Sequence, residues 1–145
     1  MKTLWPSERT NLSDSELDQF EQALLPHFEE KLAQLAINKA LCAYLKPFYI
    51  PFAAWLRDKK IARNGPMVVG INGAQGSGKS TMSELLALIL KDSFGLSTAI
   101  LSIDDIYKTR AQRQQMAIDI HPLFNTRGVP GTHDTSLGIE LIKQT

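Results

Sequence analysis

The feature that most constrains the fold of this chain is a glycine-rich octapeptide that stands between two contrasting segments. Residues 73–80 read Gly-Ala-Gln-Gly-Ser-Gly-Lys-Ser and match the pattern G-x-x-x-x-G-K-[ST] in full. Residues 67–71, before it, are apolar without alternation, as in a strand buried on both faces of a parallel sheet. Residues 79–91, after it, carry apolar side chains at helical spacing. The order strand, loop, helix predicts an α/β protein with a parallel sheet and flanking helices.

The glycines of the octapeptide permit backbone angles that other residues avoid, and they let the main chain approach a ligand closely. Successive N–H groups then form a concave anion site at the positive end of the following helix. Lys79 is placed to reach the β- and γ-phosphates of a nucleotide, and the Ser80 hydroxyl is placed to coordinate Mg²⁺. The alternative is a glycine-rich turn that holds no phosphate. We predict a nucleotide triphosphate site made of Gly73, Ala74, Gln75, Gly76, Ser77, Gly78, Lys79, Ser80 and Thr81.

A second buried-type strand is predicted over residues 98–103, which completes a βαβ unit of about 30 residues. Because the carboxyl ends of parallel strands share one edge of the sheet, Asp104 and Asp105 are expected beside the loop. A carboxylate there can hold Mg²⁺ or accept the proton of a hydroxyl that attacks the γ-phosphate. The alternative, favoured for Asp105, is that one of the two caps the turn before Tyr107.

Residues 1–64 are predicted to be a helical N-terminal segment. Ser13 and Glu16 form a capping box, and Pro26 is expected to end or kink the helix that follows. A second amphipathic run continues to about residue 44, and Pro51 opens a helix that ends near residue 63. A turn-forming cluster at 64–66 then separates this segment from a nucleotide-binding core over residues 65–145.

Three further local signals lie in the second half of the chain. Thr109 and Gln112 predict a capped helix over 110–118, and residues 128–131 predict a turn. Asp134 is a candidate N-cap for a last helix that ends at Thr145.

Composition limits the classes of partner. The 145-residue chain carries 16 Lys+Arg against 15 Asp+Glu, a formal net charge of +1. This balance predicts no long-range attraction to nucleic acid or to an anionic membrane, so anion binding must come from a local site. The single cysteine, Cys42, excludes an internal disulfide and fits a reducing compartment. The first 20 residues lack an apolar run, so we expect a cytoplasmic protein without a signal peptide.

Three segments together resemble D-glycerate 3-kinases, and more widely the P-loop small-molecule kinases related to uridine kinase and pantothenate kinase. They are residues 70–80, the stretch Ser-Ile-Asp-Asp-Ile-Tyr at 102–107, and Arg-Gly-Val-Pro-Gly-Thr-His-Asp at 127–134. The resemblance covers residues 45–142 and implies a P-loop NTPase-type parallel sheet. It also implies ATP-dependent phosphoryl transfer to a hydroxyl of a small metabolite, with D-glycerate as the best candidate and pantothenate or a nucleoside as alternatives.

The resemblance also assigns roles to residues. Lys79 and Asp104 are implied as catalytic residues, and Ser80 and Asp104 as ligands of Mg²⁺. Ile106 stands where the wider kinase group has an aromatic residue, but the carboxylate before it is kept. The implied acceptor site contains Asp105, Tyr107, Arg127, His133 and Asp134.

For the last group, plainer roles stay open. Arg127 suits a bidentate contact to a carboxylate or a surface salt bridge. His133 suits a donor to a substrate hydroxyl or a turn histidine without a catalytic role. Asp134 suits an acceptor from a hydroxyl or the helix N-cap named above.

The family fold is about twice the length of this chain, so the sequence is expected to represent the amino-terminal part of such a kinase. This expectation leaves two alternatives to a complete kinase. One is a nucleotide-binding module without turnover, and the other is an ATPase that drives a conformational change. The sequence predicts no oligomeric state.

Overall fold

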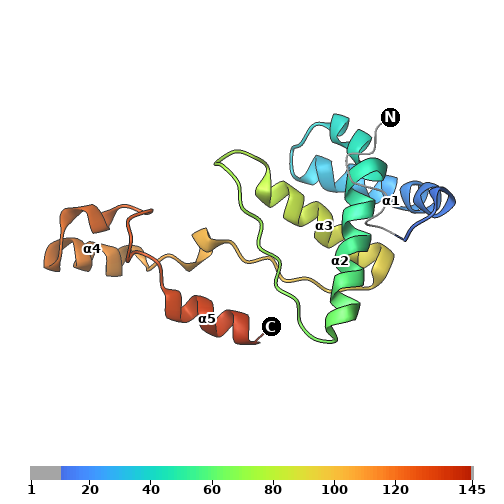
Figure 1. Ribbon diagram of the computed structural model, residues 1–145. Coiled ribbons are helices and arrows are strands. Elements are labelled where there is room, and N and C mark those ends of the chain that lie inside the picture. The colour runs from blue at the N-terminus through green and yellow to red at the C-terminus, as the bar shows by residue number, and fades with distance from the viewer. Residues whose placement is uncertain (1–10, 145) are drawn as a thin grey trace. The chain divides into compact units, whose positions relative to one another are not determined.

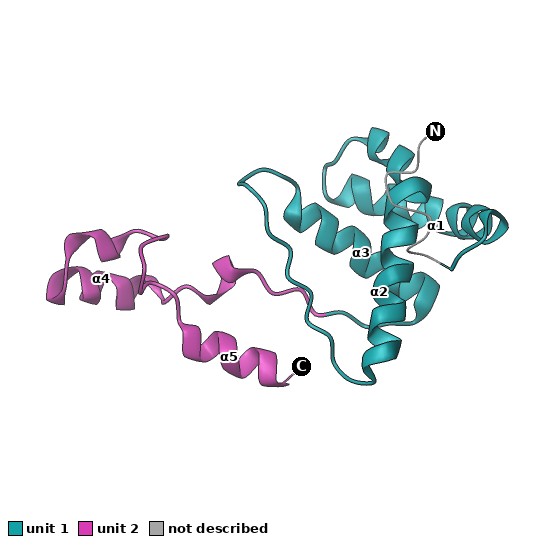
Figure 2. Ribbon diagram, viewed as in Figure 1, with its two compact units in different colours: residues 1–98 teal, residues 99–145 magenta. Residues whose placement is uncertain are grey.

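The computed structural model describes residues 11–144, which consist of helices joined by turns and extended chain (Figure 1). The chain divides into two compact units, residues 1–98 and residues 99–145 (Figure 2). The sequence predicts a boundary at residues 64 and 65, between a helical segment and a kinase core. This boundary stays a prediction.

The first unit begins with α1 (Asp14–Gln34). Its predicted capping box is confirmed: the Ser13 hydroxyl accepts from the Glu16 N–H at 3.3 Å, and the Glu16 carboxylate accepts from the Ser13 N–H at 2.8 Å. The backbone and side-chain hydrogen bonds from Ser13 lower the pKa of Glu16. The N-terminus of α1 is thus fixed by local side-chain chemistry.

The expected end of this helix at Pro26 is wrong. Helix α1 continues through Pro26 to Gln34, so Phe28 and Leu32 belong to it and not to a second helix. A proline inside a helix removes one hydrogen bond and crowds the preceding turn. Both Phe28 and Leu32 are fully buried, and this apolar burial favours continuation of the helix.

A 3₁₀ helix, η2 (Lys39–Tyr44), and a π-helical turn, η3 (Leu45–Tyr49), lead into α2 (Ile50–Arg63). The predicted helix start near Pro51 is confirmed, since this proline lies in the first turn of α2. Asn64 ends α2 in the left-handed conformation, with φ +51°. Asparagine is one of the few residues that adopt this conformation readily.

Helix α3 (Lys79–Phe94) confirms the helix predicted after the glycine-rich loop. It ends at Gly95, where φ is +64°. Helices α1, α2 and α3 pack together (Figure 1). An ion pair from Lys31 to Glu84 at 2.6 Å and a hydrogen bond between His27 Nδ1 and Asp92 at 2.9 Å join α1 to α3.

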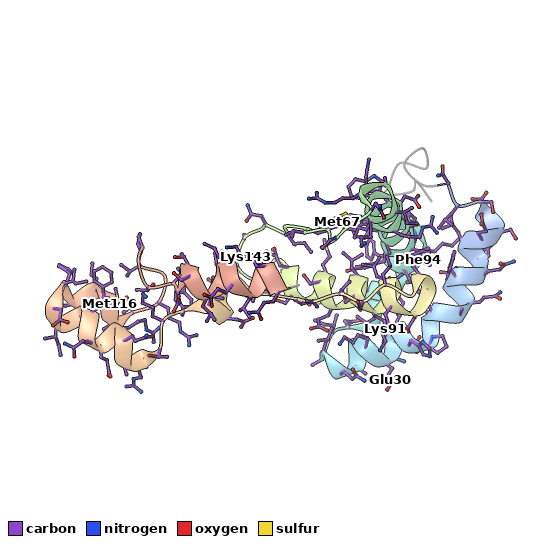
Figure 3. All side chains as sticks on the ribbon, turned by 90° about the horizontal axis from the view of Figure 1, so that it is seen from below. Glu30, Met67, Lys91, Phe94, Met116 and Lys143 are labelled. Atoms are coloured by element: carbon purple, nitrogen blue, oxygen red, sulfur yellow. The ribbon has the colours of Figure 1, made fainter. Side chains whose placement is uncertain are left out.

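The core of the first unit is a cluster of buried side chains from α1, η3, α2 and α3. Partly buried side chains, among them Met67 and Phe94, pack against it (Figure 3). Its buried members are Leu24, Phe28, Leu32, Leu45, Tyr49, Ile50, Ala53, Leu56, Leu85, Leu86, Ile89 and Leu90.

The predicted parallel sheet is wrong. Residues 11–144 contain no strand and no sheet, and the described chain is all-helical. The two segments predicted as strands, 67–71 and 98–103, are largely extended chain without ladder hydrogen bonds, and Val68 is 76% exposed. A parallel strand needs partners on its edges and layers on both faces, and these segments find neither. The apolar composition of these two segments therefore predicted burial within a sheet, and the described residues form no such sheet.

The second unit contains η4 (Ile103–Ile106), α4 (Arg110–Asp119), η5 (Pro122–Asn125) and α5 (Thr135–Gln144). The predicted capping box of Thr109 and Gln112 is confirmed at the start of α4. The predicted turn at 128–131 is confirmed as well, with φ +89° at Gly128 and +91° at Gly131. The predicted helix end at Thr145 lies outside the described residues. Within residues 11–144, every helix is too short or too polar to cross a bilayer.

Candidate functional site

The glycine-rich loop is exposed and leads directly into α3. Gly76 and Gly78 have φ of +74° and +86°, in the left-handed region that favours glycine. The Ser77 N–H donates to the Ala74 carbonyl oxygen at 3.2 Å, which closes the turn between them. The loop conformation therefore depends on glycine at two defined positions.

Lys79 folds back over this loop. Its Nζ atom donates to the carbonyl oxygens of Gly73 and Ala74, at 2.8 Å in each case. A Cβ atom on Gly73 would lie 2.7 Å from the Ser77 hydroxyl and 3.6 Å from Cγ of Lys79. The loop thus wraps closely around the lysine side chain, and the ammonium group sits over its first residues.

The N-terminus of α3 adds positive character at the same place. Gly78 is the N-cap of α3 and provides no side-chain acceptor to the first turn. The first N–H groups of a helix have no intrahelical partner and carry the positive end of the helix dipole. Ser80 and Thr81 lie in this first turn, and Ser80 is exposed. The loop, the helix start and Lys79 together form an open site suited to an anion.

In the second unit, three of the predicted acceptor-site residues come together. The rings of Tyr107 and His133 stack with centroids 4.0 Å apart, and the same two residues form an isolated antiparallel bridge. The Arg127 guanidinium lies over the Tyr107 ring, 5.4 Å from its centroid. The tyrosine ring is therefore covered by an imidazole and approached by a cation.

The carboxylates take other positions. Asp105 accepts from the Ser102 N–H at 3.2 Å and completes a capping box for η4, which is the alternative considered for it. Asp134 accepts from the Leu137 N–H at 3.0 Å and caps α5, again the plainer alternative. The Asp104 side chain is exposed.

The predicted site residues fall into two groups that the structure describes separately. Residues 73–81 belong to the first unit, and the acceptor-site residues and Asp104 belong to the second. The expectation that Asp104 lies beside the loop rested on the shared edge of a sheet, and residues 11–144 form no sheet. Its role as base and metal ligand now rests on the family resemblance alone.

The described residues suit Mg²⁺ only when a bound phosphate provides further oxygen ligands. In residues 11–144, no three His, Cys, Asp or Glu side chains gather in an arrangement that could hold a metal ion. Mg²⁺ commonly binds through one or two protein oxygens together with substrate phosphates, and not through a complete protein cage. The exposed Ser80 hydroxyl at the start of α3 is such an oxygen.

One residue of interest, Arg113, was not predicted from the sequence. Arg113 on α4 is only 8% exposed, and its Nε and Nη1 atoms have no hydrogen-bond partner in the described part of the chain. Arg113 lies in the polar run Arg-Ala-Gln-Arg-Gln-Gln at 110–115, where no apolar periodicity marks a buried position. No sequence signal would have identified it.

Comparison with known proteins gives a partial match. No family model matches this chain. A region of 73 residues, 49% of the chain, is 40% identical to a Schizosaccharomyces pombe protein named "Uncharacterized kinase mug58". The matched region spans about a quarter (26%) of that protein. No solved structure matches. About half of the chain is therefore similar to a protein named as a kinase.

Proposed function

We propose that this chain contributes to ATP-dependent phosphoryl transfer from Mg·ATP to a hydroxyl of a small metabolite. The observation that carries the proposal is the Lys79 ammonium group, held over an exposed glycine-rich loop at the N-terminus of α3. The partial likeness to a protein named as a kinase supports the same class of reaction. The proposal depends on the loop and the helix start, and not on a sheet.

In this proposal, the polyphosphate lies in the loop at residues 73–81. Backbone N–H groups there and the Lys79 ammonium donate to phosphate oxygens, and Ser80 provides an oxygen ligand for Mg²⁺. Bound Mg²⁺ would neutralise charge on the β- and γ-phosphate oxygens. Phosphoryl transfer passes through a loose transition state, so the protein acts chiefly by positioning and by electrostatic stabilisation.

The proposed acceptor is a small hydroxy acid, with D-glycerate as the first candidate. Arg127 and His133, both near the Tyr107 ring, provide a cation and a ring nitrogen that suit a carboxylate and a hydroxyl. Asp104 is proposed as the group that accepts the hydroxyl proton late in the transfer. The capping bonds of Asp105 and Asp134 make them weaker candidates for direct contact with the acceptor.

The test is ADP release from Mg·ATP with D-glycerate, pantothenate, a nucleoside or water as acceptor. We expect D-glycerate to raise ADP release well above the rate in water, with a 3-phosphorylated acid as product. Release that depends on pantothenate or a nucleoside would keep the reaction class and replace the acceptor. Saturable Mg·ATP binding without turnover for any acceptor would contradict the proposed activity and leave a nucleotide-binding module. Equal release in water and with every acceptor would indicate an ATPase.

A further inference from the structure

The second unit contains a buried cation without a counter-charge. Two nitrogen atoms of the Arg113 guanidinium are inaccessible to solvent and have no hydrogen-bond partner within residues 11–144. Arginine stays protonated in proteins, so this charge cannot be relieved by loss of a proton. A buried charge without partners is strongly unfavourable. The guanidinium therefore calls for an acceptor that the described chain does not provide.

His133 presents a second unsatisfied group. Its Nε2 atom is buried and has no partner in the described residues, while its ring is held by stacking on Tyr107. A ring nitrogen of this kind donates a hydrogen bond when it carries the proton. Two side chains of the second unit, Arg113 and His133, thus have buried nitrogen atoms that lack hydrogen-bond partners in the described residues, and both can donate a hydrogen bond.

Backbone pairing brings these two residues to the same end of α4. The Lys108 N–H donates to the Thr132 carbonyl oxygen at 2.8 Å, beside the Tyr107–His133 bridge. Helix α4 starts directly after this pairing, and the Arg113 N–H donates to the Thr109 carbonyl oxygen one turn into the helix. Long side chains on a helix lean toward its N-terminus, which directs the Arg113 side chain toward the paired segments.

The acidic side chains of the second unit leave this charge uncompensated. None of them forms an ion pair in the part of the chain that the structure describes, and the nearest in sequence to His133, Asp134, caps α5. The neighbouring Arg127 adds a further positive charge over the Tyr107 ring. These acidic residues are Asp104, Asp105, Asp119, Asp134 and Glu140.

We propose that Arg113 and His133 form a binding site for a small oxyanion, a carboxylate or a phosphate, that lies at the start of α4. The guanidinium carries a permanent positive charge, and its unpartnered Nε–H and Nη1–H groups can donate to oxygens of such a group. The Nε2 atom of the His133 ring, when it carries the proton, can donate to another oxygen. The site is argued from the second unit alone. It does not depend on nucleotide binding at the loop of residues 73–81.

The test is an NMR titration of the full chain, without nucleotide, using acetate, D-glycerate and inorganic phosphate at constant ionic strength. We expect saturable shifts of the Arg113 Nε–H signal and of the His133 ring signals with at least one of these probes. A response to acetate and D-glycerate alone identifies a carboxylate site, and a response to phosphate alone identifies a phosphate site. Shifts that do not saturate with any probe would overturn the proposal.

Substitutions distinguish a specific binding site from a general attraction of anions to the arginine side chains of α4. Arg113→Gln should weaken probe affinity by about tenfold or more, since it removes a charge-assisted hydrogen bond. Arg110→Gln, an exposed arginine one turn earlier on α4, is the matched control and should leave affinity within about twofold. His133→Phe keeps an aromatic ring against Tyr107 and should weaken binding less than Arg113→Gln. Equal effects of the two glutamine variants would contradict the proposal.

Thermal stability provides an independent test in case a variant folds poorly. Replacing a buried, unpaired charge by an apolar side chain of similar size is neutral or stabilising. Arg113→Met should therefore match or exceed the wild-type Tm in buffer without oxyanions. An oxyanion that binds should raise the Tm of the wild type only. A large drop in Tm for Arg113→Met in oxyanion-free buffer would show that Arg113 has a partner inside the protein, and would contradict the proposal.

Discussion

The ammonium group of Lys79 donates a hydrogen bond to the carbonyl oxygen of Gly73, 2.8 Å away. The first residue of α3 thereby holds the start of the loop that precedes the helix. A phosphate oxygen in place of this carbonyl would keep the ammonium group hydrogen-bonded and would add a full opposite charge. Exchange of a neutral acceptor for a charged one strengthens the interaction.

Lys79→Met should weaken Mg·ATP binding, because it keeps an aliphatic side chain and removes the charge. A hydrogen bond to a charged group is worth about 1.5–3 kcal/mol, which corresponds to roughly a tenfold to hundredfold loss in affinity. The matched control is Lys91→Met in the last turn of the same helix (Figure 3), which should bind normally. Isothermal titration calorimetry measures both. Unchanged affinity in Lys79→Met would show that this lysine does not contact the phosphates.

Gly78→Ala should impair nucleotide binding, and Gly95→Ala should not. These glycines cap the two ends of α3 with φ of +86° and +64°, and a Cβ atom at either position meets no atom within 4 Å. Each alanine therefore costs about 1–2 kcal/mol of stability through backbone strain alone. Denaturant unfolding should show similar losses for both variants, while calorimetry should show weaker ATP binding only for Gly78→Ala. Equal ATP affinities would mean that the loop conformation is unimportant for binding.

Local signals in the sequence predicted local structure well. The capping boxes at Ser13 and Thr109 depend on interactions within a few residues, and each gives the expected helix start. The same locality accounts for the turn at 128–131. Local hydrogen bonds and backbone preferences are enough to determine these features.

Predictions that depend on distant partners failed. The apolar run at 67–71 has the composition of a buried strand, but a sheet requires strands and layers that these residues do not find. Pro26 was expected to end or kink a helix, yet the helix does not end there, because the burial of Phe28 and Leu32 in the core outweighs the cost of the proline. The buried Arg113 lies in a largely polar run, so its burial reflects tertiary packing.

Asp134→Ala should destabilise α5, because it removes the acceptor of the Leu137 N–H. Loss of an N-cap costs about 1 kcal/mol, which should speed hydrogen exchange of the Leu137 amide roughly fivefold. Asp134→Asn keeps a capping oxygen and should exchange at nearly the wild-type rate. If the asparagine variant exchanges as fast as the alanine variant, the negative charge matters more than the capping bond.

The Cys42 thiol should react slowly with alkylating reagents at pH 8. Burial raises the pKa of this thiol, and the neighbouring Glu29 carboxylate raises it further, so the reactive thiolate is scarcer than in a free cysteine. The rate of alkylation should therefore rise at a higher pH than it does for the chain unfolded in urea. Cys42 is the single cysteine, so the whole signal reports on it. Equal rates at pH 8 before and after unfolding would contradict the raised pKa.

The central claim is that the backbone of residues 73–81 binds the phosphates of Mg·ATP. Amide chemical shifts of the isotope-labelled chain, followed during titration with Mg·ATP, test this claim most directly. We predict saturable shifts that are largest from Gly76 to Ser80, in the loop and the first turn of α3. Absence of saturable shifts, or saturable shifts confined to residues outside this loop, would contradict it.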